Sequence, residues 1–421
     1  MTAAAGQAAD AEQTAGQRRR SLAFGRAFWV FWTGAFLSNV GSWAESTVTP
    51  AVVVTVSQSA AWTTALIAVP TMLSLVSAPI GGRLVDRHGA VGLLFGSLTV
   101  LAVLGAARAG YWMSGGRDVL VLLLLATVGG VVAGAGGPAW NKLFNDLVSD
   151  QVREQAMLME SLQLRISRIA GPAVGAGLLL VGGPAAVFLL DAISFLLVIT
   201  GCAAAIRIAP DRARPTRRAT GPTPSLRALA QRLRVEIVLI AVVAAFATAP
   251  LRLLPVLINL DLGLSMKTYA LLASVPAIGS VLAGPIGFVV VDRDRRWIVR
   301  SVLLFGLAAT VGGIGLAQAV PWLVVLLVLY GFASAIVSAA LTARVQTTSP
   351  DARGQAAALT FIAQGVGLAT ASLAWGGLAD SLGASATMTI AGVCLMAGAV
   401  YFVLHRRRLA QPSVGSAGVD T

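Results

Sequence analysis

Charged residues, cysteine and histidine are all scarce in this chain. Only 12% of its 421 residues are charged, and it contains two cysteines and two histidines. Because Cys202 and Cys394 both lie in apolar runs, a disulfide framework is excluded, and no His or Cys spacing indicates a metal site. No Gly-rich loop followed by Lys indicates ATP binding. The acidic residues of the apolar segments are scattered, without the converging groups that catalysis needs. We therefore predict no enzymatic activity and no cofactor.

Apolar residues are abundant instead. They make up 57% of the chain, and the mean hydropathy is +0.81, far above that of water-soluble domains. About 20 apolar residues cross about 30 Å of hydrocarbon as a helix, and the period-two alternation of a membrane β-barrel is not visible. We predict an all-α membrane protein with twelve transmembrane helices. The predicted spans are 28–57, 63–83, 90–110, 118–141, 154–181, 184–207, 235–263, 267–290, 297–317, 321–344, 354–378 and 385–404.

The formal charge of +13 raises the question of a nucleic-acid partner. On the predicted spans, Arg165, Arg168 and Arg252 lie within the membrane, and only Arg108, Arg117 and Lys267 lie outside. The remaining basic residues fall on the side of the N-terminus, which is the positive-inside pattern. The distribution of basic residues therefore indicates the membrane topology. We predict that both termini are cytoplasmic and that the chain lies in the inner cell membrane, surrounded by lipid. We predict no nucleic-acid partner.

Composition also marks the segments outside the membrane. The first residues are rich in Ala, Gln and Gly and end in three arginines, without the apolar core of a signal peptide. A basic stretch with four prolines separates the sixth and seventh spans, as expected of a linker. The predicted organisation is a disordered cytoplasmic tail 1–25, a six-helix bundle 26–207, a cytoplasmic linker 208–234, a second six-helix bundle 235–405 and a tail 406–421.

An internal repeat relates the two bundles. Val69-Pro70, Pro79-Ile80-Gly81 and Val85-Asp86-Arg87 recur as Val275-Pro276, Pro285-Ile286-Gly287 and Val291-Asp292-Arg293, each 206 residues later. Repeats of this length indicate duplicated structural units. Duplicated halves of membrane transporters bind substrate between them near the bilayer midplane and alternate by rocking.

The loop after the second span carries Gly82-Arg83-Leu84-Val85-Asp86-Arg87-His88-Gly89. This segment and its repeat resemble the Gly-x-Leu-x-Asp-Arg-x-Gly signature of the major facilitator superfamily, and the chain is similar to its drug and siderophore exporters, although Ala90 and Val91 replace two usual basic residues. The resemblance implies the major facilitator fold and a cytoplasmic gate. The implied gate residues are Gly82, Asp86, Arg87, Gly89, Asp292 and Arg293. A carboxylate is favoured at a helix N-terminus, where we expect Asp86. A plain positive-inside turn is the alternative.

The fifth span contains a second motif. Residues 167–175, including Gly171, Pro172 and Gly175, are similar to the Gly-x-x-x-Gly-Pro-x-x-Gly motif of antiporters in this superfamily, with Ser167 in place of the first glycine. The resemblance implies export. Close helix packing, which small residues also permit, is the alternative reading.

Ionisable residues inside spans are costly and mark function or structural pairs. Glu45 and Arg252 lie in the first and seventh spans, which line the central cavity in the family that the chain resembles. We predict that they form a pair there, with Glu45 as the proton-coupling or cation-binding group; anchoring at the headgroups is the alternative. Arg165 and Arg168 share a helix face. They bind an anion or are neutralised by a carboxylate such as Asp191.

These observations predict a proton-coupled exporter of an amphipathic or zwitterionic small molecule, such as an antibiotic or siderophore, acting as a monomer. An importer of the same fold and a transport-inactive receptor or assembly partner are the alternatives. Exporters of this superfamily that use protons usually carry an arginine in the fourth span, and residues 118–141 contain none. Proton coupling therefore depends on the resemblance and on Glu45 and Asp191.

Overall fold

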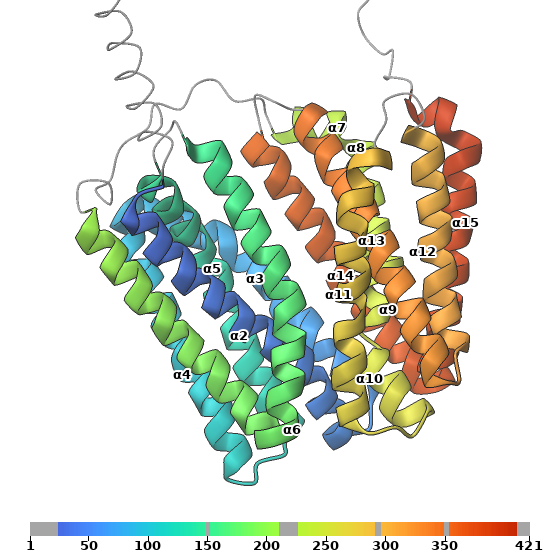
Figure 1. The fold of residues 1–421 in the computed structure, drawn as a ribbon, viewed down its shortest axis with the longest axis horizontal. Coiled ribbons are helices and arrows are strands. Elements are labelled where there is room, and N and C mark those ends of the chain that lie inside the picture. Colours follow the sequence, from blue (N-terminus) through green and yellow to red (C-terminus); the bar gives the residue numbers. More distant parts are fainter. Residues whose placement is uncertain (1–23, 149–151, 210–225, 291–295, 349–352, 411–421) are drawn as a thin grey trace, which may run out of the picture. The chain divides into compact units, whose positions relative to one another are not determined.

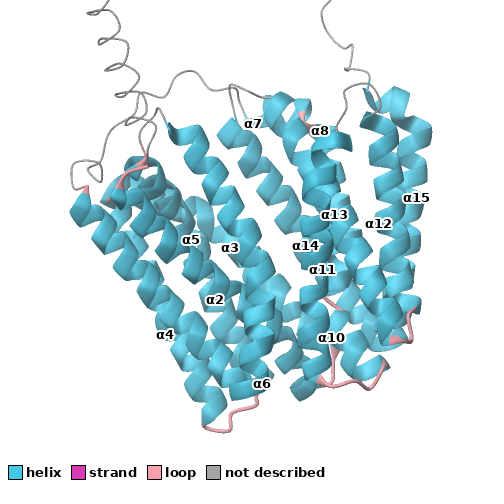
Figure 2. Ribbon diagram, viewed as in Figure 1, coloured by secondary structure: helices cyan, strands magenta, loops and turns pink. Residues whose placement is uncertain are grey.

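A computed structural model describes residues 24–148, 152–209, 226–290, 296–348 and 353–410. Across these ranges the chain is helical, with short turns and no strand (Figure 2). The helices are α2 Arg26–Ser57, α3 Ala60–His88, α4 Ala90–Met113, α5 Val119–Leu147, α6 Arg153–Ile208, α7 Leu226–Arg232, α8 Arg234–Val243, α9 Ala249–Leu251, α10 Leu254–Val256, α11 Met266–Val290, α12 Arg296–Leu316, α13 Val320–Thr348, α14 Arg353–Leu382 and α15 Ala384–Ala410. The prediction of an all-α protein is confirmed for these residues.

The chain divides into two compact units. Unit 1 consists of Met1–Ser46, Val76–Gly116 and Val128–Arg218, and unit 2 consists of Thr47–Leu75, Arg117–Thr127 and Ala219–Thr421. Unit 2 therefore contains parts of α2, α3 and α5 in addition to the predicted second bundle. Within the predicted linker 208–234, α7 is helical and its Leu229 packs in the core of unit 2.

In the described ranges, nine helices are long and apolar enough to cross a bilayer. One of them, α6, has 56 residues, about 84 Å of helix and far more than the hydrocarbon thickness of about 30 Å. It is divided at Gly183, whose φ of 67° is left-handed and interrupts the helix. The division falls between the predicted spans 154–181 and 184–207. The total of twelve spans stays a prediction.

Glycine contacts repeat in the two units. In unit 1, Gly105 of α4 packs against Ala192 of α6, and in unit 2, Gly312 of α12 packs against Gly392 of α15. Figure 1 shows α12 and α15 side by side. These are the third and sixth spans of each predicted bundle, so the same pair of spans is joined through small residues in both. Small residues bring helix backbones together where the bilayer offers no hydrophobic drive for association.

Candidate functional site

Glycines allow the helices that carry a charged group in unit 1 to approach closely. A Cβ added to Gly105 of α4 would lie 3.1 Å from the Cα of Ala192 in α6. A Cβ on Gly41 of α2 would lie 2.5 Å from the Oγ of Ser194, also in α6. These contacts lie within about one helical turn of three ionisable side chains. The three residues are Glu45 of α2, Arg108 of α4 and Asp191 of α6.

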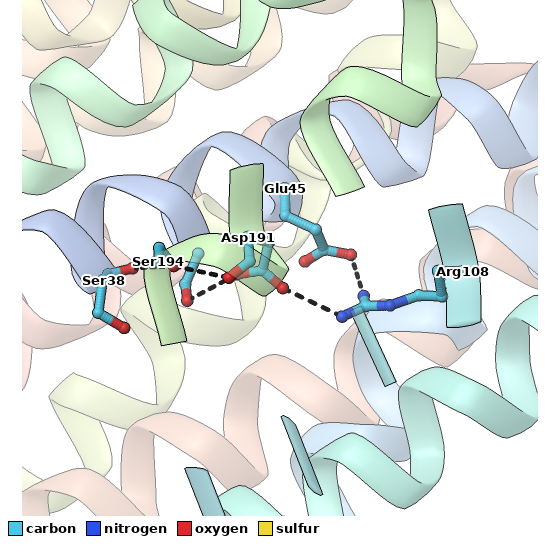
Figure 3. A network of polar contacts seen from close by, with 6 residues as sticks. Ser38, Glu45, Arg108, Asp191 and Ser194 are labelled. Carbon is cyan, nitrogen blue, oxygen red and sulfur yellow. Dashed lines mark hydrogen bonds and ion pairs between the residues drawn. The ribbon is translucent and has the colours of Figure 1, made fainter. Parts of the chain in front are cut away.

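Arg108 joins the two carboxylates (Figure 3). Its Nη1 donates to Oε1 of Glu45, and its Nη2 donates to Oδ2 of Asp191 at 3.2 Å. The side chains are largely buried, with exposed fractions of 11% for Arg108, 15% for Glu45 and 3% for Asp191. A charged residue at the centre of a span costs roughly 2.5–3.5 kcal/mol. Mutual pairing offsets part of that cost.

Neighbouring groups fix this arrangement, which we call the Glu45–Arg108–Asp191 group. Ser42 donates to Oδ1 of Asp191 at 3.0 Å, and Ser194 donates to the Asp191 carbonyl at 2.7 Å (Figure 3). The guanidinium of Arg108 lies 5.9 Å from the ring centre of Phe188. Its Nε has no hydrogen bond to any described residue. The two terminal nitrogens therefore carry the pairing, one to each carboxylate.

The charges of this group do not cancel. With both carboxylates ionised, two negative charges face one positive charge. Arginine keeps its charge in proteins, so one further proton on a carboxylate would make the group neutral. The arrangement therefore leaves one negative charge in excess among α2, α4 and α6.

One prediction about partners within unit 1 was wrong. Arg108, whose place outside the membrane stays a prediction, is a buried member of the charged group. Asp191, expected to neutralise Arg165 or Arg168, is bonded to Arg108 and Ser42 instead. The reason is the division of α6: Arg165 and Arg168 precede the break and Asp191 follows it.

The two arginines before the break have other surroundings. The guanidinium carbon of Arg168 lies 4.7 Å from the centre of the Trp43 ring, a cation–π contact. Arg165 is exposed and makes no ion pair with any described residue. Arg165 therefore does not pair with the Glu45–Arg108–Asp191 group.

A signal for Arg108 was present in the sequence. The residue falls inside the predicted span 90–110, two residues from its end. Counting it as an intramembrane charge would have supplied a cation for both Glu45 and Asp191. Which carboxylates it meets depends on the packing of α4 against α6 and could not be read from spacing.

In unit 2, the span that carries Arg252 is broken, although the sequence predicted one continuous helix over 235–263. α8 is followed by a π-helical turn η2 (Ala244–Thr248), the short helices α9 and α10, and a second π-helical turn η3 (Leu257–Asp261). Pro250 lies at the break and has no N–H for the helical ladder. The Arg252 amide donates to the Ala249 carbonyl at 3.0 Å, in a tighter turn than an α-helix. Arg252 therefore lies at a point where the backbone of its span is irregular.

Aromatic side chains satisfy carbonyls near this break. The indole Nε1 of Trp375 donates to the Ala245 carbonyl at 2.8 Å, and the Tyr330 hydroxyl donates to the Ala247 carbonyl at 3.3 Å. A buried carbonyl without a donor is costly, so these two bonds stabilise the irregular backbone. Irregular backbone is tolerated at membrane depth where protein packs around it.

Arg252 itself is partly exposed, and Tyr269 and Tyr330 are the tyrosines near it. Both tyrosines are buried in the core of unit 2. The predicted partner of Arg252 was Glu45, which belongs to unit 1 and has Arg108 as a partner there. The pairing of Glu45 with Arg252 stays a prediction.

The predicted cytoplasmic gate is only partly described. Asp86 and Arg87 are exposed in the last turn of α3 and make no hydrogen bond or ion pair with a described residue of unit 1. Asp86 thus does not occupy the N-terminus of its own helix. Gly89 has a φ of 85° and begins α4 with a sharp turn, as expected for a glycine at this position. Asp292 and Arg293 lie outside the described residues, so the gate stays a prediction.

The antiporter-like motif packs on α2. A Cβ on Gly171 would lie 2.3 Å from the Trp43 Cβ, and one on Gly175 would lie 2.9 Å from the Ala44 carbonyl oxygen. Pro172 lies between these contacts, inside α6. The two glycines therefore serve close packing of α6 against α2 in unit 1. Among the described residues, no cluster of three or more His, Cys, Asp or Glu could hold a metal ion.

Solved structures of membrane transporters have the same fold. A POT family transporter in complex with a thioalcohol-conjugated peptide is 11% identical, with a TM-score of 0.72 over 92% of this chain and 97% of that one. A POT family transporter in complex with 5-aminolevulinic acid is 11% identical, with a TM-score of 0.71 over 93% and 99%. A bacterial homolog of the human lysosomal transporter Spinster, in an inward-facing and occupied conformation, is 16% identical, with a TM-score of 0.71 over 92% and 98%.

At these identities the likeness shows the fold alone, which these multi-pass membrane transporters share. No curated protein matches the chain. The family described as transmembrane secretion effector matches residues 23–416, nearly the whole sequence. The chain therefore belongs to the transmembrane secretion effector family.

Proposed function

We propose that this protein is a secondary active transporter that exports an amphipathic small molecule in exchange for protons, by alternating access. It acts as a monomer in the inner cell membrane, with both termini in the cytoplasm. The Glu45–Arg108–Asp191 group carries the proposal. It is the one place among the described residues where two carboxylates share one cation inside a membrane span.

Charge counting explains how such a group can couple transport to protons. A net charge of −1 in a span is unfavourable, and one proton removes it. Loss of the proton restores both ion pairs with Arg108 and stabilises the packing of α2, α4 and α6 that the structure contains. Protonation of Glu45 or Asp191 breaks one of the two ion pairs of Arg108. The proton therefore changes the relative stability of two helix arrangements, which is what coupling requires.

Two further features support export. Residues 167–175 are similar to the antiporter motif, and the family name describes secretion. The gate formed by Gly82, Asp86, Arg87 and Gly89 with Asp292 and Arg293 closes the cytoplasmic side during export. An ion gradient supplies the energy, since one elementary charge moving through 100 mV releases about 2.3 kcal/mol.

The test uses the purified full chain in proteoliposomes with an imposed pH gradient. Dye flux is measured with the amphipathic dyes rhodamine 110 and rhodamine 123 and with a panel of siderophores, while trapped pyranine reports internal pH. We expect substrate movement and proton movement in opposite directions. Both should cease in Glu45→Gln or in Asp191→Asn. Asp146→Asn is the matched control, because Asp146 pairs with Lys142 on one face of α5 and lies outside the charged group.

Each outcome has a distinct meaning. Substrate and proton moving in the same direction would make the protein an importer. Export that continues in both Glu45→Gln and Asp191→Asn would refute the role of the charged group. Absence of any gradient-driven flux across the panel, in protein that is folded by circular dichroism, would refute the exporter and favour a receptor or assembly role.

A further inference from the structure

Arg252 stands out among the charges of unit 2 because none of the carboxylates described in that unit forms an ion pair with it. The described part of unit 2 contains four carboxylates. They are Asp118, Glu236, Asp261 and Asp380. Each has another partner. The partners are, respectively, the Leu120 amide, the Arg344 guanidinium, the Ser385 amide and the amides of Ala60 and Ala61.

The two acids on the broken span itself show this most directly. Glu236 begins the span and accepts a hydrogen bond from Nε of Arg344 at 2.5 Å. Asp261 ends it and accepts one from the Ser385 amide, at the start of α15, at 2.7 Å. Both carboxylates, at the two ends of the span, are therefore already hydrogen-bonded to other residues. Arg252 lies between them along the span and forms no ion pair with either.

Two buried tyrosines of unit 2, Tyr269 and Tyr330, are hydrogen-bonded to backbone carbonyls. Tyr269 donates its hydroxyl proton to the Thr47 carbonyl at 3.0 Å, and Tyr330 donates to the Ala247 carbonyl at 3.3 Å. An arginine cannot lose its proton in a protein, so its charge inside the membrane calls for an anion. The residue as a whole is partly exposed.

We propose that Arg252, at the break of its span, binds the oxyanion of the transported compound, a carboxylate in the first instance. The inference rests on the proposed function, because it assigns the site to the exported molecule. A planar guanidinium binds carboxylate or phosphate oxygens through two parallel hydrogen bonds. Binding sites of membrane transporters are commonly built at discontinuous helices, where the irregular backbone is held by the surrounding protein.

The aromatic surroundings indicate the rest of the ligand. Phe246 and Trp375 lie against each other at the same break, with ring centres 5.7 Å apart in an edge-to-face arrangement. The core of unit 2 around them is apolar. The substrate class is therefore an amphipathic compound with an apolar or aromatic body and one anionic group.

A matched pair of dyes tests the anionic group. Rhodamine 110 has a free carboxylate, and rhodamine 123 is its methyl ester. Binding is measured by fluorescence polarisation with the purified full chain in phosphatidylcholine nanodiscs, without any gradient. We expect the wild type to bind rhodamine 110 at least about tenfold more tightly than rhodamine 123, as charge-assisted hydrogen bonds of a guanidinium imply. Equal binding of the two dyes, or binding of neither, would overturn the site.

Variants assign the preference to Arg252. Arg252→Gln should bring the ratio of the two affinities to about one while rhodamine 123 binds as in the wild type, which also shows that the variant is folded. Arg252→Lys keeps the charge and should retain part of the preference. Lys267→Gln removes an exposed charge from the start of α11 and should change nothing. A preference that survives Arg252→Gln would refute the assignment.

Two further arms separate this inference from its alternatives. Nanodiscs with added phosphatidylglycerol test a lipid phosphate as the ligand: loss of the dye preference there would assign the guanidinium to lipid and overturn a substrate site. The proteoliposome assay separates the site from transport. Binding of rhodamine 110 without flux would refute the exporter and leave the site, whereas flux of rhodamine 123 with no preference for rhodamine 110 would refute the site and leave the exporter.

Discussion

Removal of the Arg108 charge should destabilise unit 1 more than removal of either carboxylate. In Arg108→Gln, Glu45 and Asp191 remain in the protein interior without their cation, and their exposed fractions of 15% and 3% allow little solvation. Loss of one partner from a buried ion pair typically costs about 3–5 kcal/mol. A loss of about 3 kcal/mol raises the unfolding equilibrium constant by roughly two orders of magnitude. The triple variant Arg108→Gln, Glu45→Gln, Asp191→Asn should recover most of the loss, because no uncompensated charge remains.

The measurement is the free energy of unfolding in mixed micelles titrated with dodecyl sulfate and followed by circular dichroism. A double-mutant cycle between Glu45 and Arg108 should give a coupling energy of about 1.5 kcal/mol, near the upper end for polar pairs in membrane proteins. The matched cycle is Lys142 with Asp146, an ion pair at 3.6 Å along one helix, where about 0.3–0.5 kcal/mol is expected. Equal coupling in the two cycles would refute the reasoning, and so would a triple variant less stable than Arg108→Gln.

Three other changes test the packing of the helices. Gly81→Ala should destabilise the fold by about 1–3 kcal/mol in the same titration, since the new Cβ would lie 2.0 Å from a carbonyl oxygen of α5, whereas Gly96→Ala, in open space, should not. Asp380→Ala should speed hydrogen exchange of the Ala60 amide, whose hydrogen bond the carboxylate accepts at 2.6 Å, by about fivefold, as loss of a helix cap implies; unchanged exchange would contradict the cap. Trp375→Phe should cost about 1–3 kcal/mol by leaving a carbonyl of the broken span without a donor, and a neutral result would show that the bond is dispensable.

Hydropathy and local residue chemistry were enough for much of the fold. Long apolar runs with few charges allow only helices in a bilayer, so the all-α class followed from composition alone. The division of α6 at Gly183 was also readable, because two glycines before Pro184 separate two apolar runs. These features depend on residues close together in the chain.

The charged sites could be located from sequence but not connected. Spacing placed Glu45, Asp191 and Arg252 inside spans, and the costs of burial made them candidates. Their partners were decided by which helix faces pack together: Arg108 meets Asp191 because α4 and the second part of α6 touch through Gly105. No periodicity within one helix encodes the face of another, so this information exists only in the assembled structure.

The sequence by itself therefore determined that the protein lies in a membrane and that it is helical. It also identified the ionisable residues whose burial is too costly without a functional or structural role. The tertiary structure decided how those costs are offset. Arg108 pairs with two carboxylates. The span of Arg252 is interrupted, and the acids at its two ends, Glu236 and Asp261, are hydrogen-bonded to other residues. The physical reason is that apolar burial is a property of each segment, whereas an ion pair requires two side chains within about 4 Å, a distance set by the packing of segments far apart in the chain.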